Sequence, residues 1–414
     1  MHSTPDRFPR SILRHPLILP LYLPALLLSV AQGLILPVLP LYAREFNAPY
    51  LWVGLVLAGD GLGLLAGDIP AGLVMQRLDR RGGMLLGISL VGLGTLACFW
   101  AGSLPEALLY RFIAGLGNAL YNVARHTYVA DTITIANRGK SVALLGGTFR
   151  MGRMLGPVIG GMVAGSAGIR WPFVLYALVC AAAAFAIFYF NRGNSAGQGG
   201  LAPRAAADKH AKMTPRSLAR SLRGHARVLA APGVGHYLMQ MVRAGPAVVL
   251  PLYGATVLGM QVEEIGYLMG VASFIDMLFF YPTGIIMDRF GRKWAVVPSA
   301  LIMSLGLALI PFTGSPLGLA AAAVLNGLGN GLGSGVMITM GADLAPREGR
   351  SEFLGLWSLI GDAGSSSGPV LVGAVTDLLA LSPATWVIAT SGLAAASVFG
   401  LLVPETLKRS AEPA

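Results

Sequence analysis

The chain has 414 residues, of which 55% are hydrophobic and 12% charged, and its mean hydropathy is +0.67. A soluble domain carries about 25% charged residues. The composition therefore excludes a soluble globular protein and indicates a protein embedded in a membrane.

Long apolar segments follow one another along the whole chain. A membrane-spanning helix needs roughly 20 mostly apolar residues, which predicts an all-α membrane protein with twelve transmembrane helices. We place these helices at residues 17–42, 51–75, 83–104, 107–131, 140–165, 171–191, 232–258, 265–287, 294–313, 316–342, 353–379 and 384–404.

A charged turn occurs twice at corresponding places. GIIMDRFGRK, Gly284 to Lys293, joins two apolar segments, and GLVMQRLDRR, Gly72 to Arg81, does the same 212 residues earlier. The offset of 212 also relates Gly115–Asn118 (GLGN) to Gly327–Asn330 (GLGN). A repeat of this length predicts two parallel six-helix halves. We expect a first half at 1–191, a central loop at 192–231 and a second half at 232–414. The central loop is expected to be a solvated segment, and a short surface helix near 215–229 is the alternative.

The positions of the basic residues explain the net charge of +11. With the N-terminus in the cytoplasm, 23 of the 30 Lys and Arg fall on cytoplasmic segments, and only Arg44 and Arg170 fall on the other face. This is the positive-inside pattern. It predicts a multi-pass protein of the cell (inner) membrane with both termini cytoplasmic. Because membrane topology accounts for the basic residues, we expect no nucleic-acid partner.

Charged residues also occur inside the predicted spans, where they are costly and by default face protein or water. Counted from the cytoplasmic end of each helix at ~1.5 Å per residue, Arg150, Arg243, Asp276 and Asp362 lie about 16 to 18 Å deep, and Arg153 and Asp60 lie somewhat deeper. That is near the middle of a ~30 Å hydrocarbon core, where transporters bind substrate. In chain order the candidates are Asp60 with Asp68, Arg111, Arg150, Arg153, Arg243, Asp276 and Asp362.

The segment 140–165 contains GRMLGPVIGG, in which small residues recur every four positions. Such a face lets a second helix pack closely, and the proline would bend the helix. The residues of this predicted packing motif are Gly152, Gly156, Pro157, Gly160 and Gly161, with Gly368 and Pro369 at the repeat-related positions.

The sequence contains no GxxxxGK[ST] turn for nucleotide phosphates, and its two cysteines, Cys98 and Cys180, lie singly in apolar segments. We therefore expect no metal site, no cofactor and no ATP hydrolysis. A membrane-embedded enzyme is the least favoured class, because the spans contain only scattered histidines and no catalytic set.

Three of these motifs resemble the major facilitator superfamily. GIIMDRFGRK resembles its turn signature, Arg111 with Gly115 and Gly117 resembles its fourth-helix motif, and GRMLGPVIGG resembles the fifth-helix motif of twelve-helix drug:proton antiporters. The resemblance covers nearly the whole chain. It implies a secondary transporter that works by alternating access, with its cavity between the two halves.

The resemblance also implies a cytoplasmic gate. Arg77 and Arg289 would pair with Asp131 and Asp343 when the outward face is open, and Asp288 would lie against the start of segment 353–379, where an anion is favourable. Gln76 stands where the family usually has an aspartate, and Ala114 where the fourth-helix motif often has a glutamine. The alternative is that these residues only set topology. The predicted gate residues are Gly72, Gln76, Arg77, Arg81, Asp131, Gly284, Asp288, Arg289, Arg292 and Asp343.

For the interior charges we hypothesise that Arg150 or Arg153 approaches Asp276 across the interface between the halves. Either Asp60 or Asp276 would be the carboxyl that couples to protons, while permanent ion pairing that fixes helix register is the alternative. Arg111, matching the family's fourth-helix arginine, would tune a nearby carboxyl.

The resulting interpretation is a monomeric transporter in contact with lipid that exports amphipathic or drug-like small molecules in exchange for protons, as in multidrug resistance. The alternative is an uptake symporter or facilitator for a small metabolite, including an anionic one, because arginines outnumber acids in several spans.

Overall fold

The computed structural model describes residues 18–132, 135–190, 215–346 and 349–407, and all of its regular elements are helices in this part of the chain. The predicted fold class is confirmed. Each of the predicted apolar segments coincides with helix, although several are interrupted.

The first bundle begins with a π-helical turn at Ile18–Tyr22. Its α-helices are α1 (Leu23–Leu34), α2 (Val38–Arg44), α3 (Tyr50–Val74), α4 (Arg80–Ala97), α5 (Leu104–Thr132), α6 (Ile135–Ala167) and α7 (Trp171–Phe190). The predicted span 17–42 is thus interrupted before Pro37, which stands at the N-cap of α2.

The second bundle is also divided by short breaks. Its helices are α9 (Pro215–Ala244), α10 (Pro246–Thr256), α11 (Val262–Arg289), α12 (Lys293–Leu309) with a 3-10 turn at Ile310–Phe312, α13 (Pro316–Leu332), α14 (Val336–Leu344), α15 (Arg350–Leu378) and α16 (Leu381–Ser397) with a π-helical turn at Val398–Leu402. Residues 215–231, assigned to the central loop, form the beginning of α9, which continues through Pro232. The rest of the predicted loop, 192–214, lies outside the described residues.

Seven helical segments of the described chain are long and apolar enough to cross a membrane by length and composition alone. The apolar helices make this a multi-pass membrane protein, and the number of twelve spans stays a prediction. The other helices fall outside those limits of length, hydropathy and number of charged residues.

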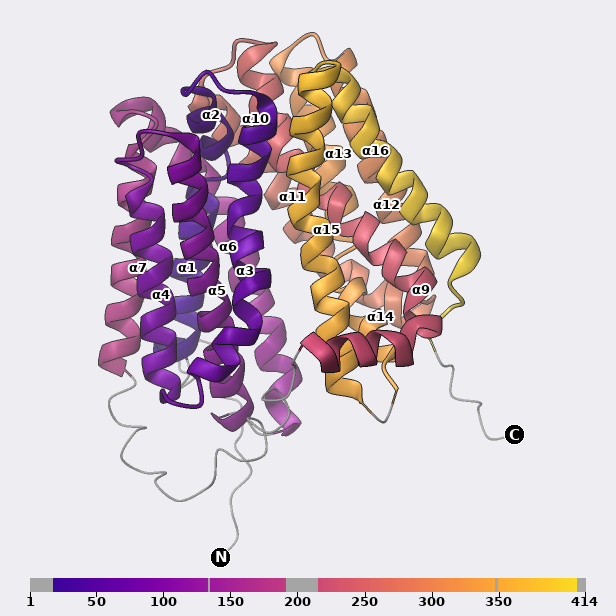
Figure 1. Ribbon diagram of the computed structural model, residues 1–414. Coiled ribbons are helices and arrows are strands. Elements are labelled where there is room, and N and C mark those ends of the chain that lie inside the picture. The colour runs from indigo at the N-terminus through magenta and orange to yellow at the C-terminus, as the bar shows by residue number, and fades with distance from the viewer. Residues whose placement is uncertain (1–17, 133–134, 191–214, 347–348, 408–414) are drawn as a thin grey trace, which may run out of the picture.

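The two bundles stand side by side (Figure 1), and their helices pack in the same way. A side chain at Gly117 of α5 would come within 2.7 Å of the Gly87 carbonyl and the Val91 amide of α4. At Gly329 of α13 it would meet Ser299 and Met303 of α12 at 3.0 and 2.8 Å, each 212 residues further on. The GLGN repeats therefore mark the closest approach of equivalent helix pairs, where only glycine leaves room for the neighbouring backbone.

The predicted packing motif of α6 faces two neighbours. Gly152, Gly156 and Gly160 lie against α1, where a methyl group at Gly156 would reach the backbone of Gly33. Gly161 instead faces α11, with a Cβ only 3.0 Å from Gly266. Gly368 repeats the first contact against Met241 of α9. The small residues thus serve both packing within a half and packing between halves.

The halves meet along two pairs of long helices, α3 with α15 and α6 with α11, and through α2 with α10. We call the end with the two charged turns, 75–79 and 290–292, the turn end, and the other the opposite end. Close contacts between halves begin at the opposite end, where Gly54 packs on Pro369 and Gly161 on Gly266. Toward the turn end, Gly72, Gly147 and Gly284 have no atom within 4 Å of a Cβ position. The halves are therefore closed at the opposite end and apart at the turn end, as the ribbons of Figure 1 also show.

Asp377, near the end of α15, closes the opposite end in an unusual way. Its two carboxylate oxygens accept hydrogen bonds from the backbone amides of Tyr50 (2.7 Å) and Leu51 (2.8 Å), the first turn of α3. Pro49 at the N-cap provides no capping side chain. A residue of the second half thus caps a helix of the first.

Glu405, after the last helical turn, caps the start of α12. Its carboxylate accepts from the backbone amides of Arg292 (2.9 Å) and Lys293 (3.1 Å), and from those of Thr406 and Leu407. Partial burial opposes ionisation, but these four donors outweigh it and hold the pKa of Glu405 below its ordinary value of 4.5.

We expect the stabilising contribution of the Glu405 carboxylate to be lost in acid. Because its folded-state pKa is depressed, its contribution is complete at pH 7 and is lost as the pH falls through about 4.5 and below. Thermal unfolding of the purified protein and of Glu405→Gln checks this between pH 7 and pH 3.5. The wild type should have the higher midpoint at pH 7 and lose this advantage in acid, and a constant difference at every pH would contradict the assignment.

Candidate functional site

Arg150 and Asp276 form an ion pair that joins the two halves. Arg150 lies midway along α6 and Asp276 midway along α11, with 2.7 Å between Nη1 and Oδ2. The side chains are 17% and 14% exposed, so solvent screens the pair only partly. The Arg150 guanidinium also contacts the Ser334 hydroxyl and lies 4.5 Å from the centre of the Phe280 ring. The structure thus brings together the two residues that the sequence hypothesis paired.

Asp60 is the centre of a second polar cluster, within the first half. Its Oδ1 accepts from Asn118 Nδ2 at 2.9 Å and lies 3.6 Å from Arg111 Nη2. Arg111 is buried and also donates to Thr95 Oγ1 at 3.3 Å. Gln32 of α1 donates to Asn118 Oδ1 at 3.3 Å. Asp60 is therefore held by helices of its own half, whereas Asp276 pairs across the interface.

The two acids have equivalent amide partners. Asn118 binds Asp60, and Asn330, which is 212 residues later, donates to Asp276 Oδ1 at 3.1 Å. The acids themselves do not correspond, because Asp60 aligns with Ala272, one helical turn before Asp276. The asparagine that ends each GLGN motif thus donates to an aspartate of its own half, and the two aspartates occupy positions that differ by one helical turn.

A break between α13 and α14 lies beside the Arg150–Asp276 pair. Gly333 accepts from Arg243 Nη2 at 2.5 Å through its carbonyl, Ser334 contacts Arg150, and Gly335 has φ +75°. A side chain is strained at that φ, so glycine permits the chain to leave one helix and start the next. Three consecutive residues therefore connect Arg243 of α9 with the interface pair.

The remaining interior candidates lie nearby without joining the pair. Arg153 is exposed on α6 and lies within electrostatic range of Arg243. Asp362 of α15 is partly buried, and Asp68 of α3 is close enough for the two negative charges to repel each other across the interface. The predicted belt of interior charges is thus divided into the Asp60 cluster and an interface group around Arg150.

At the turn end, the second half has a different pairing from the one the resemblance implies. Asp343 lies 2.9 Å from Arg292 Nε rather than beside Arg289, because Gly291 (φ +117°) turns the chain and brings Arg292 back toward α14. Arg292 Nη1 also donates to the Met287 carbonyl at 2.8 Å. Asp288 is 82% exposed and lies 3.7 Å from Arg292.

In the first half, Gln76 and Arg77 are exposed, and Arg81 donates to the Phe188 carbonyl of α7 at 2.7 Å. The side chain of Asp131 lies outside the described residues, so the expected pairing with Arg77 stays a prediction. The resemblance associates both latches with an open outward face, whereas here the halves are apart at the turn end.

Several polar residues that contact these sites were not among the predicted site residues. They are Gln32, Thr95, Asn118, Asn330 and Ser334. Asp377, which joins the halves at the opposite end, was also missed. The two asparagines carried a signal, since each ends a repeated GLGN motif inside an apolar span. Ser334 carried none, because its partner is more than 180 residues away along the chain. Asp377 carried a signal as an acid near the end of the predicted span 353–379, but its partners, more than 320 residues away, could not be inferred.

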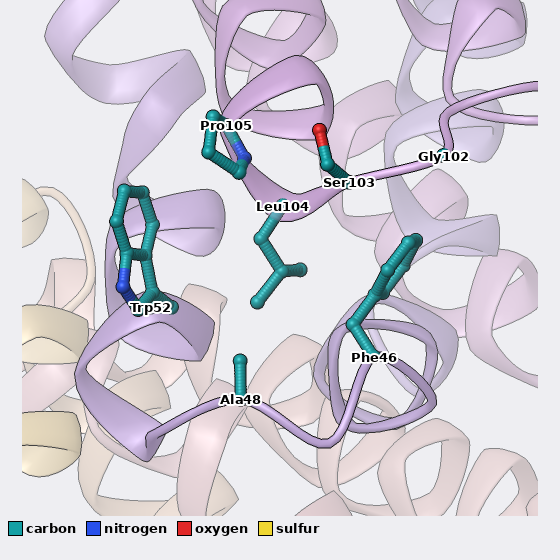
Figure 2. Close-up of a pocket in the computed structure, with 7 residues that line it drawn as sticks. All are labelled: Phe46, Ala48, Trp52, Gly102, Ser103, Leu104 and Pro105. Atoms are coloured by element: carbon teal, nitrogen blue, oxygen red, sulfur yellow. The ribbon is translucent and has the colours of Figure 1, made fainter.

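Two cavities differ in chemistry. One, of about 350 Å³, lies at the opposite end of the first half, where Figure 2 shows Trp52 and Phe46 on either side of Leu104. The other, of about 280 Å³, lies between α9, α14 and α15. Only the second borders the interior charges, through Arg243 and Asp362.

The sequence profile of the Major Facilitator Superfamily matches residues 21–261 and 233–414. The chain belongs to the Major Facilitator Superfamily. It is 26% identical over 371 residues to the class C tetracycline resistance protein of Escherichia coli, covering 86% of this chain and 88% of that protein. An uncharacterized MFS-type transporter of Methanocaldococcus jannaschii is 20% identical over 356 residues, covering 84% and 88%.

A solved structure of a POT family transporter in complex with 5-aminolevulinic acid superposes with a TM-score of 0.79 at 14% identity, covering 96% of this chain and 98% of that one. At this identity the likeness concerns the fold. As a member of this superfamily, the protein is a membrane transporter and not an enzyme.

Proposed function

We propose that this protein exports amphipathic small molecules in exchange for protons, with both termini on the cytoplasmic side of the cell membrane. The observation that carries the proposal is the Arg150–Asp276 pair, which is partly buried at mid-depth and spans the two halves. A carboxylate at such a place can bind a proton only by giving up its arginine, so proton binding and the contact between halves are linked.

Protonation of Asp276 would remove the negative charge that faces Arg150. The neutral carboxyl can still accept from Asn330, but the ion pair that draws α6 to α11 is lost. Arg150 keeps Ser334 and the Phe280 ring as neighbours. The contact at mid-depth is thereby weakened, which favours rearrangement of one half against the other and offers the guanidinium to a competing substrate group.

Asp60 supports the proposal as a second carboxyl. It is neutralised within its own half by Arg111 and Asn118, so its protonation would not directly alter the interface. We therefore assign coupling to Asp276 and a supporting role, through Arg111 and Gln32, to Asp60. The turn-end residues, including Arg292 with Asp343, are proposed as the cytoplasmic gate.

Export is favoured over uptake by the similarity to the tetracycline resistance protein, which extends over most of both chains. The test uses proteoliposomes that enclose a pH-sensitive dye. Addition of tetracycline, tetraphenylphosphonium or an aromatic acid to one side should drive protons in the opposite direction. Protons moving with the compound would show a symporter, and transport without proton movement would show a facilitator.

Uptake of a small anion is the second candidate, and Arg243 favours it. This arginine borders the 280 Å³ cavity, and its Nε has no hydrogen-bond partner among the described residues. Saturable uptake of an organic anion that persists after the proton gradient is collapsed would support this candidate and exclude proton-coupled export.

A further inference from the structure

The second cavity is bordered by the start of a helix inside the membrane. Gly335, Met337 and Ile338 are the N-cap and first turn of α14, and no side chain caps this helix. The first N–H groups of a helix have no partner within it, and the helix dipole adds partial positive charge there. The break between α13 and α14 thus places the uncapped start of a helix at the edge of the cavity.

Two side chains of α9 add further polar atoms to the same cavity. His236 is 4% exposed, and its Nδ1 has no hydrogen-bond partner in the described structure. Arg243 uses Nη2 for the Gly333 carbonyl and Nη1 for Gln240, which leaves Nε without a partner. A buried polar atom without a partner is costly, so unfilled hydrogen-bonding capacity here points to a ligand.

The rest of the lining defines the body of that ligand. Trp357 stacks on His236 with 4.3 Å between ring centres, and Met337 and Ile338 provide an aliphatic wall. The side chain of Asp362 also borders the cavity, where it can accept a hydrogen bond from a donor on the ligand and disfavours a second anionic group. About 280 Å³ is close to the lower end of ligand pockets, roughly 300 Å³.

We propose that this cavity binds an organic anion with one carboxylate or equivalent group, held by the first turn of α14, Arg243 and His236, and with an apolar body against Trp357. The proposal rests on the proposed transport function and names its substrate class. Arg243, which is part of this site, donates to the Gly333 carbonyl, and the next residue, Ser334, contacts Arg150 of the coupling pair. A ligand in the site would therefore be linked to the coupling pair through these two neighbouring residues.

The test compares 1-naphthoate with two probes of the same ring, 1-naphthamide and 1-naphthylmethylamine, by calorimetric titration of the purified wild-type protein. We expect naphthoate to bind at least about tenfold more tightly than either, because a charge-assisted hydrogen bond is roughly twice as strong as a neutral one. Arg243→Gln should reduce naphthoate affinity by about tenfold or more and leave naphthamide unchanged.

Arg170→Gln is the matched control, since it removes the same charge at the opposite end, where Arg170 lies 3.8 Å from Glu45. It should bind naphthoate as the wild type does. Equal affinity for acid and amide, tighter binding of the amine, or no binding of naphthoate overturns the proposal. If Arg243→Gln does not fold, His236→Phe takes its place and should likewise weaken naphthoate binding. If neither variant folds, the comparison of the three probes on the wild-type protein decides. Proton movement driven by other compounds would still support the transport function if this proposal fails.

Discussion

Asp276→Asn is expected to abolish substrate-driven proton movement while labelled substrate still exchanges across the membrane. Asparagine cannot take up or release a proton, but it is nearly the same size and can still bond Asn330. In proteoliposomes with an internal pH dye, the proton signal should fall to the level of empty vesicles. Exchange of labelled substrate at equal concentrations on both sides requires only the movement of the halves, so it should persist.

The variant also leaves Arg150 without its counter-charge. Removing one partner of a buried ion pair costs roughly 3 kcal/mol or more, so Asp276→Asn should be less stable than the wild type. The double variant Arg150→Gln/Asp276→Asn removes both charges and should recover much of that stability without recovering coupling. This separates loss of coupling from loss of fold.

Asp79→Asn is the matched control for coupling. Asp79 caps α4 by accepting from the Gly82 amide at 3.0 Å in the exposed charged turn, and asparagine caps helices equally well. The control should move protons as the wild type does. Proton movement that survives in Asp276→Asn but vanishes in Asp60→Asn would transfer the coupling role to Asp60. Survival in both variants would make the interior pairs structural.

Asp377→Ala is expected to shift the protein toward the arrangement in which the turn end closes. The two hydrogen bonds to Tyr50 and Leu51 exist only while the halves touch at the opposite end. Loss of a helix N-cap costs about 1 kcal/mol. A change of that size between two states alters their ratio roughly fivefold.

Spin labels at Gly72→Cys and Gly284→Cys measure this shift. Both positions have open space around the Cβ, so the labels should not disturb packing, and the native Cys98 and Cys180 are buried. The wild type should give mainly the longer distance, and Asp377→Ala should increase the population at the shorter one. Asp79→Ala removes a cap that does not bridge the halves and should leave the distribution unchanged. An identical shift in both variants would mean that cap loss acts through general destabilisation.

Much of the architecture could be predicted from local patterns. Apolar segments must be helical in a membrane, because every backbone group needs a partner there. The offset of 212 identified equivalent helix pairs, and the contacts of Gly117 and Gly329 follow that offset. The interior charges were identified because any charge in an apolar segment requires a partner or water.

The sequence by itself therefore determined the class of protein, its internal repeat and the set of residues able to do chemistry. Only the tertiary structure decided which of them meet. Asp343 pairs with Arg292 because Gly291 adopts φ +117°, Asp377 caps a helix more than 320 residues away, and the break at Gly335 opens α14 toward Arg243. Depth along a helix follows from counting residues, but partners across an interface depend on helix rotation and on which end of the halves is closed. These result from the packing of the whole molecule.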